Sequence, residues 1–113
     1  MIMTQNELVT VSAWNRRQLY VAIYGKSLNE VLMMRRGLQV GLTKYAKKHK
    51  YDEVQAGIIS ICGQLESWCR KAFYAKRLSE VIRTDWTLCK KGKASAKAIV
   101  AKEWEAMIRE ASY

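Results

Sequence analysis

Apolar and polar residues follow each other along most of this chain with the period of an α-helix. The clearest run begins after Asp52, where apolar residues recur in alternating steps of four and three positions: Val54, Ile58, Ile61, Leu65, Trp68, Ala72 and Ala75. That spacing places them on one face of a helix, where they can line a core. The pattern therefore predicts a central helix over residues 53–76.

Capping signals indicate where two helices begin. Ser27 is followed three positions later by Glu30, and Asp52 is followed three positions later by Gln55. Each pair can satisfy free N–H groups in the first turn of a helix. Gly25 suits the end of the helix before Ser27, because glycine readily adopts the left-handed conformation found there.

These signals predict an all-α fold, a compact bundle of four to five helices in a single domain over residues 1–113. The expected helices span residues of about 12–24, 28–48, 53–76, 78–91 and 95–111. The first is the least determined, because β-branched and aromatic residues in positions 8–11 and 19–24 also suit a β-hairpin. A helix is favoured there because the remaining sequence offers no other strands.

Glycine and arginine interrupt the apolar face of the expected 28–48 helix. Gly37 and Gly41 would each weaken an exposed helix by roughly 1 kcal/mol relative to alanine, and their spacing instead predicts a close helix crossing. Arg35 falls on the apolar side, so we expect it either to pair with a carboxylate or to extend past the core. The central helix has a face of small residues that would admit another helix or a second copy: Ala56, Ser60, Gly63 and Ser67.

Two segments carry the excess positive charge. The 113 residues hold 20 Lys and Arg against 10 Asp and Glu, a formal net charge of +10. Residues 31–50 contain six basic and no acidic residues, and residues 70–97 contain nine basic and two acidic residues. Because half of the residues are apolar, the chain can form a core and is not a disordered polybasic tail. Such a charge favours a polyanionic partner.

We predict that both segments contact nucleic acid. In the first, basic side chains point away from the apolar face of the helix. In the second, Tyr74 lies between Arg70 and Arg77 as a stacking position for a base, and lysines around Gly92 could contact phosphates. The candidate residues are Arg36, Lys44, Lys47, Lys48, Lys50, Arg70, Lys71, Tyr74, Arg77, Lys90, Lys91, Lys93 and Lys97.

The sequence offers no arrangement of residues for catalysis or metal binding, and we expect no cofactor. His49 is the only histidine and lies among lysines, with no nucleophile and orienting carboxylate in a recognisable pattern. Cys62 and Cys69 are expected to fill the core, and three cysteines do not match a zinc pattern or a closed disulfide set. Reduced thiols, the absence of a signal peptide and the absence of a long apolar run favour a cytoplasmic protein without membrane contact.

The leading hypothesis is therefore a non-enzymatic helical protein that contacts the phosphate backbone of RNA or DNA through two basic faces. It would act alone or as a small subunit of a ribonucleoprotein or DNA complex. One alternative is a small inhibitor, immunity or phage-type regulatory protein that docks on an acidic partner, or self-associates through the small-residue face. Another is a helix-turn-helix DNA-binding regulator over residues 20–36, with Tyr20 and Tyr24 at apolar positions, Gly25 in the turn, and Val31 and Met34 facing inward.

Overall fold

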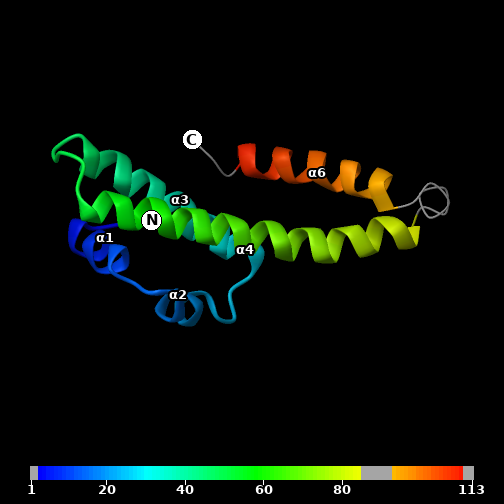
Figure 1. Cartoon of the computed structure of the whole chain (residues 1–113), viewed down its shortest axis with the longest axis horizontal. Helices are drawn as coiled ribbons and strands as arrows, with labels where there is room; N and C mark the ends of the chain where they lie inside the picture. Colours follow the sequence, from blue (N-terminus) through cyan, green and yellow to red (C-terminus); the bar gives the residue numbers. More distant parts are fainter. Residues whose placement is uncertain (1–2, 85–92, 111–113) are drawn as a thin grey trace. The chain divides into compact units, whose positions relative to one another are not determined.

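The computed structural model describes residues 3–84 and 93–110, which form five α-helices and no strand (Figure 1). The prediction of an all-α fold is confirmed, and the alternative of a β-hairpin near the N-terminus is wrong. The helices are α1 (Gln5–Ser12), α2 (Arg16–Ile23), α3 (Leu28–Ala46), α4 (Glu53–Thr84) and α6 (Lys93–Glu110).

The single helix expected over residues 12–24 is wrong, because two short helices occupy this region. Their break is set by Asn15, whose side-chain oxygen accepts a hydrogen bond from the Gln18 backbone N–H at 2.8 Å. The Gln18 side chain accepts in return from the Asn15 backbone N–H at 2.9 Å. This reciprocal capping box starts α2. Gly25, at φ 77°, follows α2 in the left-handed conformation expected for a helix end.

The expected end of the central helix at residue 76 is also wrong, because α4 continues to Thr84. The sequence between Ala75 and Leu78 has neither glycine nor proline, and its residues are good helix formers. The first part of the helix expected over 78–91 therefore belongs to α4, and residues 85–91 lie outside the described part of the chain. α6 begins two residues before the expected start at residue 95.

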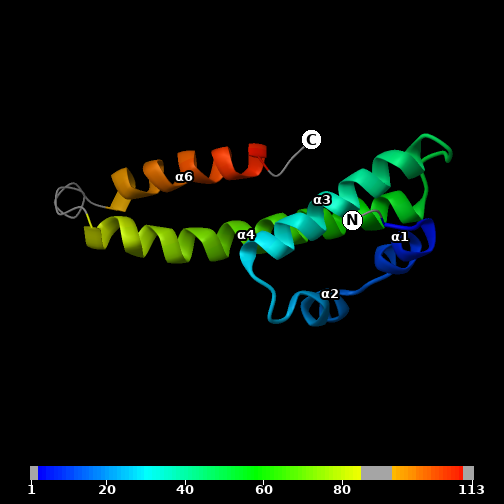
Figure 2. The ribbon, with the colours of Figure 1, turned by 180° about the vertical axis from the view of Figure 1, so that it is seen from behind.

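The chain contacts group into two compact units, Met1–Ser67 and Trp68–Tyr113, and the boundary falls within α4. In the first unit, α3 runs beside the first half of α4, and α1 lies at the end where the turn at residues 47–52 joins them (Figures 1 and 2). The core of this unit consists of fully buried side chains from these three helices, including Leu8, Val31, Leu38, Ile58 and Leu65. Cys62 is also buried, as predicted, and so is Cys69 in the second unit.

Two glycines allow α1 to approach its neighbours. A Cβ atom at Gly57 of α4 would collide with the backbone carbonyl oxygen of Ser12. A Cβ atom at Gly41 of α3 would lie 3.1 Å from Leu8 Cδ1. The close crossing predicted for Gly41 is therefore confirmed. The same prediction for Gly37 is wrong, because nothing lies within 4 Å of its Cβ position.

Arg35 of α3 is buried, with 7% of its surface exposed, and pairs with Glu66 of α4. Its Nη2 donates to Glu66 Oε2 at 3.1 Å, which confirms the predicted pairing with a carboxylate. Its Nε and Nη1 atoms are buried without a hydrogen-bond partner in the described structure. A buried guanidinium with unmet donors is costly, so this pair is a weak source of stability.

Replacing Arg35 by methionine is therefore expected to leave the free energy of unfolding unchanged or to raise it by about 1 kcal/mol. Replacing Glu66 by alanine leaves the buried guanidinium without its carboxylate, and should lower that free energy by about 1 to 3 kcal/mol. Urea denaturation followed by circular dichroism checks both values. A larger loss for Arg35→Met than for Glu66→Ala would show that the pair itself stabilises this unit.

The second unit is formed by the second half of α4 and α6. Val81, Ala96 and Val100 form its buried cluster, and Leu78 is among the partly buried side chains against it. The Phe73 ring lies 5.6 Å from the buried Trp104 ring, measured between centroids. No helix in the described residues is long and apolar enough to cross a membrane.

Candidate nucleic-acid interface

Four exposed lysines are concentrated where α3 ends and the turn to α4 follows. Lys44 lies in the last turn of α3, Lys47 is its C-cap residue, and Lys48 and Lys50 follow in the turn. Positive charge is favourable at this end of a helix because the backbone carbonyls there are not hydrogen-bonded within it. Among the residues that the structure describes, none of the four lysines forms an ion pair.

The turn that carries these lysines is held by side-chain hydrogen bonds. Tyr45 Oη donates to Asp52 Oδ2 at 2.6 Å, and the Gln55 backbone N–H donates to Asp52 Oδ1 at 3.1 Å. The Gln55 amide donates to the backbone carbonyl of Lys50 at 2.9 Å and contacts that of His49 at 3.4 Å. Asp52 thus caps α4 as predicted, but Gln55 supports the turn instead of completing a reciprocal capping box.

The same bonds shift the titration of two groups. The hydrogen bond from Tyr45, together with backbone hydrogen bonds to Asp52, lowers the pKa of the Asp52 carboxyl. The bond to Asp52 raises the pKa of the Tyr45 hydroxyl, with smaller effects from burial and from the Asp52 charge. The Asp52 carboxylate is therefore engaged by Tyr45 and the α4 cap, and it forms no ion pair with the adjacent lysines.

An exposed aromatic residue accompanies the lysines. Tyr51 directly follows Lys50, and 71% of its surface is exposed. Nearby, the rings of Tyr45 and His49 are stacked, with centroids 4.1 Å apart and an interplanar angle of 19°. Sequence reasoning did not select Tyr51 as a site residue, although an aromatic residue beside a lysine in a polar turn is a signal that could have identified it. We call Lys44, Lys47, Lys48, Lys50 and Tyr51 the basic turn.

Arg36 differs from the lysines in the first predicted set. It is half-buried in α3 and has an interaction with the rest of the chain. The structure therefore places four of the five residues predicted in this segment on one exposed turn, and Arg36 outside that group.

The second predicted set is only partly brought together. The Arg70 guanidinium lies 5.5 Å from the centroid of the Tyr74 ring, and Lys71 is exposed beside it on α4. Tyr74 itself is half-buried and packs against the core of the second unit. A tyrosine held in this way offers less of its ring to a ligand than Tyr51 does.

Arg77 is bound by acidic residues instead of standing free beside Tyr74. Its Nε donates to Glu103 Oε2 at 2.6 Å and its Nη2 donates to Glu103 Oε1 at 3.2 Å. Its Nη1 donates to Glu80 Oε2 at 3.1 Å. The bidentate bond with Arg77 lowers the pKa of the Glu103 carboxyl and raises that of the guanidinium. These bonds join α4 to α6 within the second unit.

Two of the four remaining predicted lysines belong to α6. Lys97 is exposed on this helix, and Lys93 is its first residue. Lys90 and Lys91 lie outside the described residues.

The two alternative functions rest on the helix-turn-helix positions over residues 20–36 and on the small-residue face of α4. In the helix-turn-helix alternative, Val31 is buried as expected and Met34 is half-buried. Tyr20 and Tyr24 are 54% and 90% exposed, and the buried side of α2 is formed by Leu19 and Ile23. The small-residue face of α4 is exposed at all four positions, and nothing lies within 4 Å of a Cβ at Gly63.

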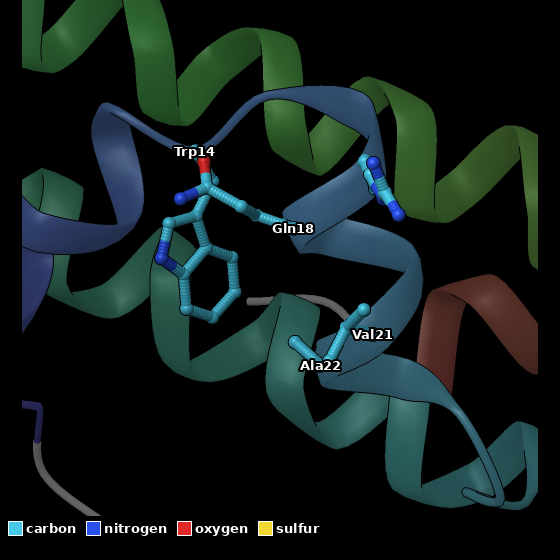
Figure 3. Close-up of a pocket in the computed structure, with 5 residues that line it drawn as sticks. Trp14, Gln18, Val21 and Ala22 are labelled. Carbon is cyan, nitrogen blue, oxygen red and sulfur yellow. The ribbon is translucent and has the colours of Figure 1, made fainter.

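α2 also borders an open pocket of about 430 Å³ (Figure 3). Its lining includes Trp14, from the connection before α2, and Arg17, Val21 and Ala22 from α2 itself. Figure 3 shows the Trp14 indole beside this helix, with Val21 and Ala22 further along it. Val21 is largely exposed. The pocket is mainly apolar, and Arg17 is the charged residue that lines it.

Reactive groups are scarce in the described residues. No group of three or more His, Cys, Asp and Glu side chains there could hold a metal ion. Burial raises the pKa of the Cys62 thiol to about 11, so it is protonated at neutral pH and is a poor nucleophile. Comparison with known proteins finds no matching protein family, no similar curated protein and no similar solved structure.

Proposed function

We propose that this protein binds nucleic acid without catalysing a reaction, and that the basic turn is its principal contact surface. The observation that supports this is the group of four exposed lysines without an ion pair in the described structure, next to a largely exposed tyrosine. Lysines neutralise backbone phosphates, and an exposed tyrosine ring stacks on an unpaired base. The combination favours single-stranded RNA or DNA over a duplex.

The arrangement of the lysines supports a polyanionic partner over simple solvation. Lys44 in the last turn of α3 is followed by Lys47 at the C-cap and Lys48 in the turn, so three like charges lie close together in the sequence. Like charges that are close together repel one another. A bound phosphate backbone removes this repulsion. The proposal extends to Arg70, Lys71 and Tyr74 of α4 and to Lys97 of α6 as further contacts.

Salt provides the direct test. If the four lysines each neutralise one phosphate, the dissociation constant for a single-stranded oligonucleotide should rise by about 50-fold between roughly 50 and 200 mM salt. Fluorescence anisotropy with labelled single strands and duplexes of RNA and DNA measures this dependence. A constant affinity over this range, or no binding to any of the four, would contradict the proposal.

A second candidate function is docking on another protein, and the surface of α2 favours it. Tyr20, Val21 and Tyr24 expose large apolar areas beside the pocket at Trp14. Exposed aromatic residues bordered by arginine are typical of the central residues in protein interfaces. Two results together would establish this alternative. The protein would bind none of the four nucleic acids, and replacing Tyr20 and Tyr24 by serine would abolish its binding to a protein partner.

A further inference from the structure

A second pocket lies at the base of the basic turn, between the start of α1 and the end of α3. Its volume is about 170 Å³, and it is more enclosed than the pocket beside Trp14. Leu8 and Gly41 are among its uncharged lining residues, and Lys44, Lys48 and His49 line it from α3 and the turn. Every part of this pocket belongs to the first unit.

Charge in this pocket is entirely of one sign. Its lining contains two lysines and a histidine but no aspartate or glutamate. Neither lysine has an ion pair within the described ranges. Apolar walls strengthen the attraction between such cations and an anion, because they exclude water from the space between them.

The pocket is large enough for a single phosphate group. Its volume of about 170 Å³ holds a tetrahedral oxyanion with its remaining hydration. A lysine ammonium group is a point charge on a flexible side chain, so two lysines that line the pocket can adjust their positions to contact the phosphate oxygens.

We propose that this pocket binds a single phosphate group, and that in the bound complex the phosphate belongs to the nucleic-acid strand held by the basic turn. The Lys44 and Lys48 ammonium groups contact the phosphate oxygens, and Thr4, which also lines the pocket, offers a hydroxyl. The second part of this inference rests on the proposed function. The first part, a phosphate site, stands on the pocket itself.

The four lysines of the basic turn provide a matched pair of variants. Lys44 and Lys48 line the pocket, whereas Lys47 and Lys50 do not. The double variants Lys44→Gln/Lys48→Gln and Lys47→Gln/Lys50→Gln therefore remove the same charge from the same turn and differ only in the pocket. All four residues are exposed, so neither variant disturbs the core.

Inorganic phosphate is the first probe, added at constant ionic strength and followed by the amide resonances of Thr4, Gly41 and Lys48. Saturable shifts are expected at these positions in the natural chain and in Lys47→Gln/Lys50→Gln. In Lys44→Gln/Lys48→Gln, phosphate binding should weaken by about tenfold or more. Absence of saturable shifts, or equal weakening in both variants, would overturn the phosphate site.

Oligonucleotides then identify the source of the phosphate. The same strand is compared with a 5′-phosphate and with a 5′-hydroxyl. If the phosphorylated strand binds more tightly, and this gain requires Lys44 and Lys48, the pocket holds a terminal phosphate. If the two strands bind equally, and their binding requires these lysines, the pocket holds a backbone phosphate.

The same measurements separate the pocket from the proposed function. Saturation by inorganic phosphate without binding of either strand supports the pocket and contradicts the proposed function. Strand binding that both variants weaken equally contradicts the pocket alone.

Discussion

Replacing Lys44, Lys47, Lys48 and Lys50 together by glutamine is expected to weaken the binding of a single-stranded oligonucleotide by at least about 100-fold at low salt. The reason is that each lysine at a phosphate releases condensed counterions from the strand, and the variant loses four such contacts. The slope of log Kd against log salt should therefore become shallower by about 2.8. Anisotropy titrations at several salt concentrations measure the affinity and the slope together.

A control variant separates this local effect from net charge. Arg16, Lys26, Lys102 and Arg109 are exposed basic residues outside the two predicted basic faces. Replacing these four by glutamine lowers the formal net charge from +10 to +6, as in the first variant. This control is expected to retain most of the affinity and of the salt slope. Equal losses in both variants would show that long-range charge, and not the basic turn, attracts the nucleic acid.

A large effect on stability is expected at Gly57. Replacing it by alanine should lower the free energy of unfolding by about 1 to 3 kcal/mol, because its Cβ would collide with the Ser12 carbonyl and force α1 and α4 apart. The atom in conflict belongs to the backbone, so no change of a side-chain rotamer relieves it. Urea denaturation followed by circular dichroism measures the loss.

Gly63 is the matched control on the same helix. Nothing lies within 4 Å of a Cβ at this position, so Gly63→Ala should raise the free energy of unfolding by up to about 1 kcal/mol through helix propensity alone. The two substitutions are chemically identical and are expected to have opposite signs. Stabilisation by both would show that α1 does not lie against Gly57 in solution.

The local pattern of the sequence was sufficient to predict the main helices. The apolar spacing from Val54 to Leu65 predicts a face that is in fact buried at Ile58, Ile61 and Leu65. The caps at Ser27 and Asp52 place the starts of α3 and α4 correctly. These predictions succeed because helical periodicity and capping depend on residues within a few positions of one another.

Helix ends without a strong signal were harder to predict. The chain between Ala13 and Asn15 breaks because Asn15 and Gln18 cap each other, a pair that is less distinctive than Ser with Glu. Near residue 77, an end was predicted where the local residues simply continue the helix. The first error arose because the cap at Asn15 is a weak signal, and the second because an end was expected where no residue stops the helix.

The sequence alone determined the net positive charge and the two basic segments that carry it. It also determined the all-α class and the exposed position of the lysines in the basic turn. Only the tertiary structure decided which charges are engaged. It ties Arg77 to Glu103 and Arg35 to Glu66, partners 26 and 31 positions away in the chain. It also forms the pocket at the base of the basic turn, because Thr4 and Leu8 meet Lys44 and Lys48 only when α1 lies against α3. Local patterns cannot specify such pairings, since they depend on how distant helices pack.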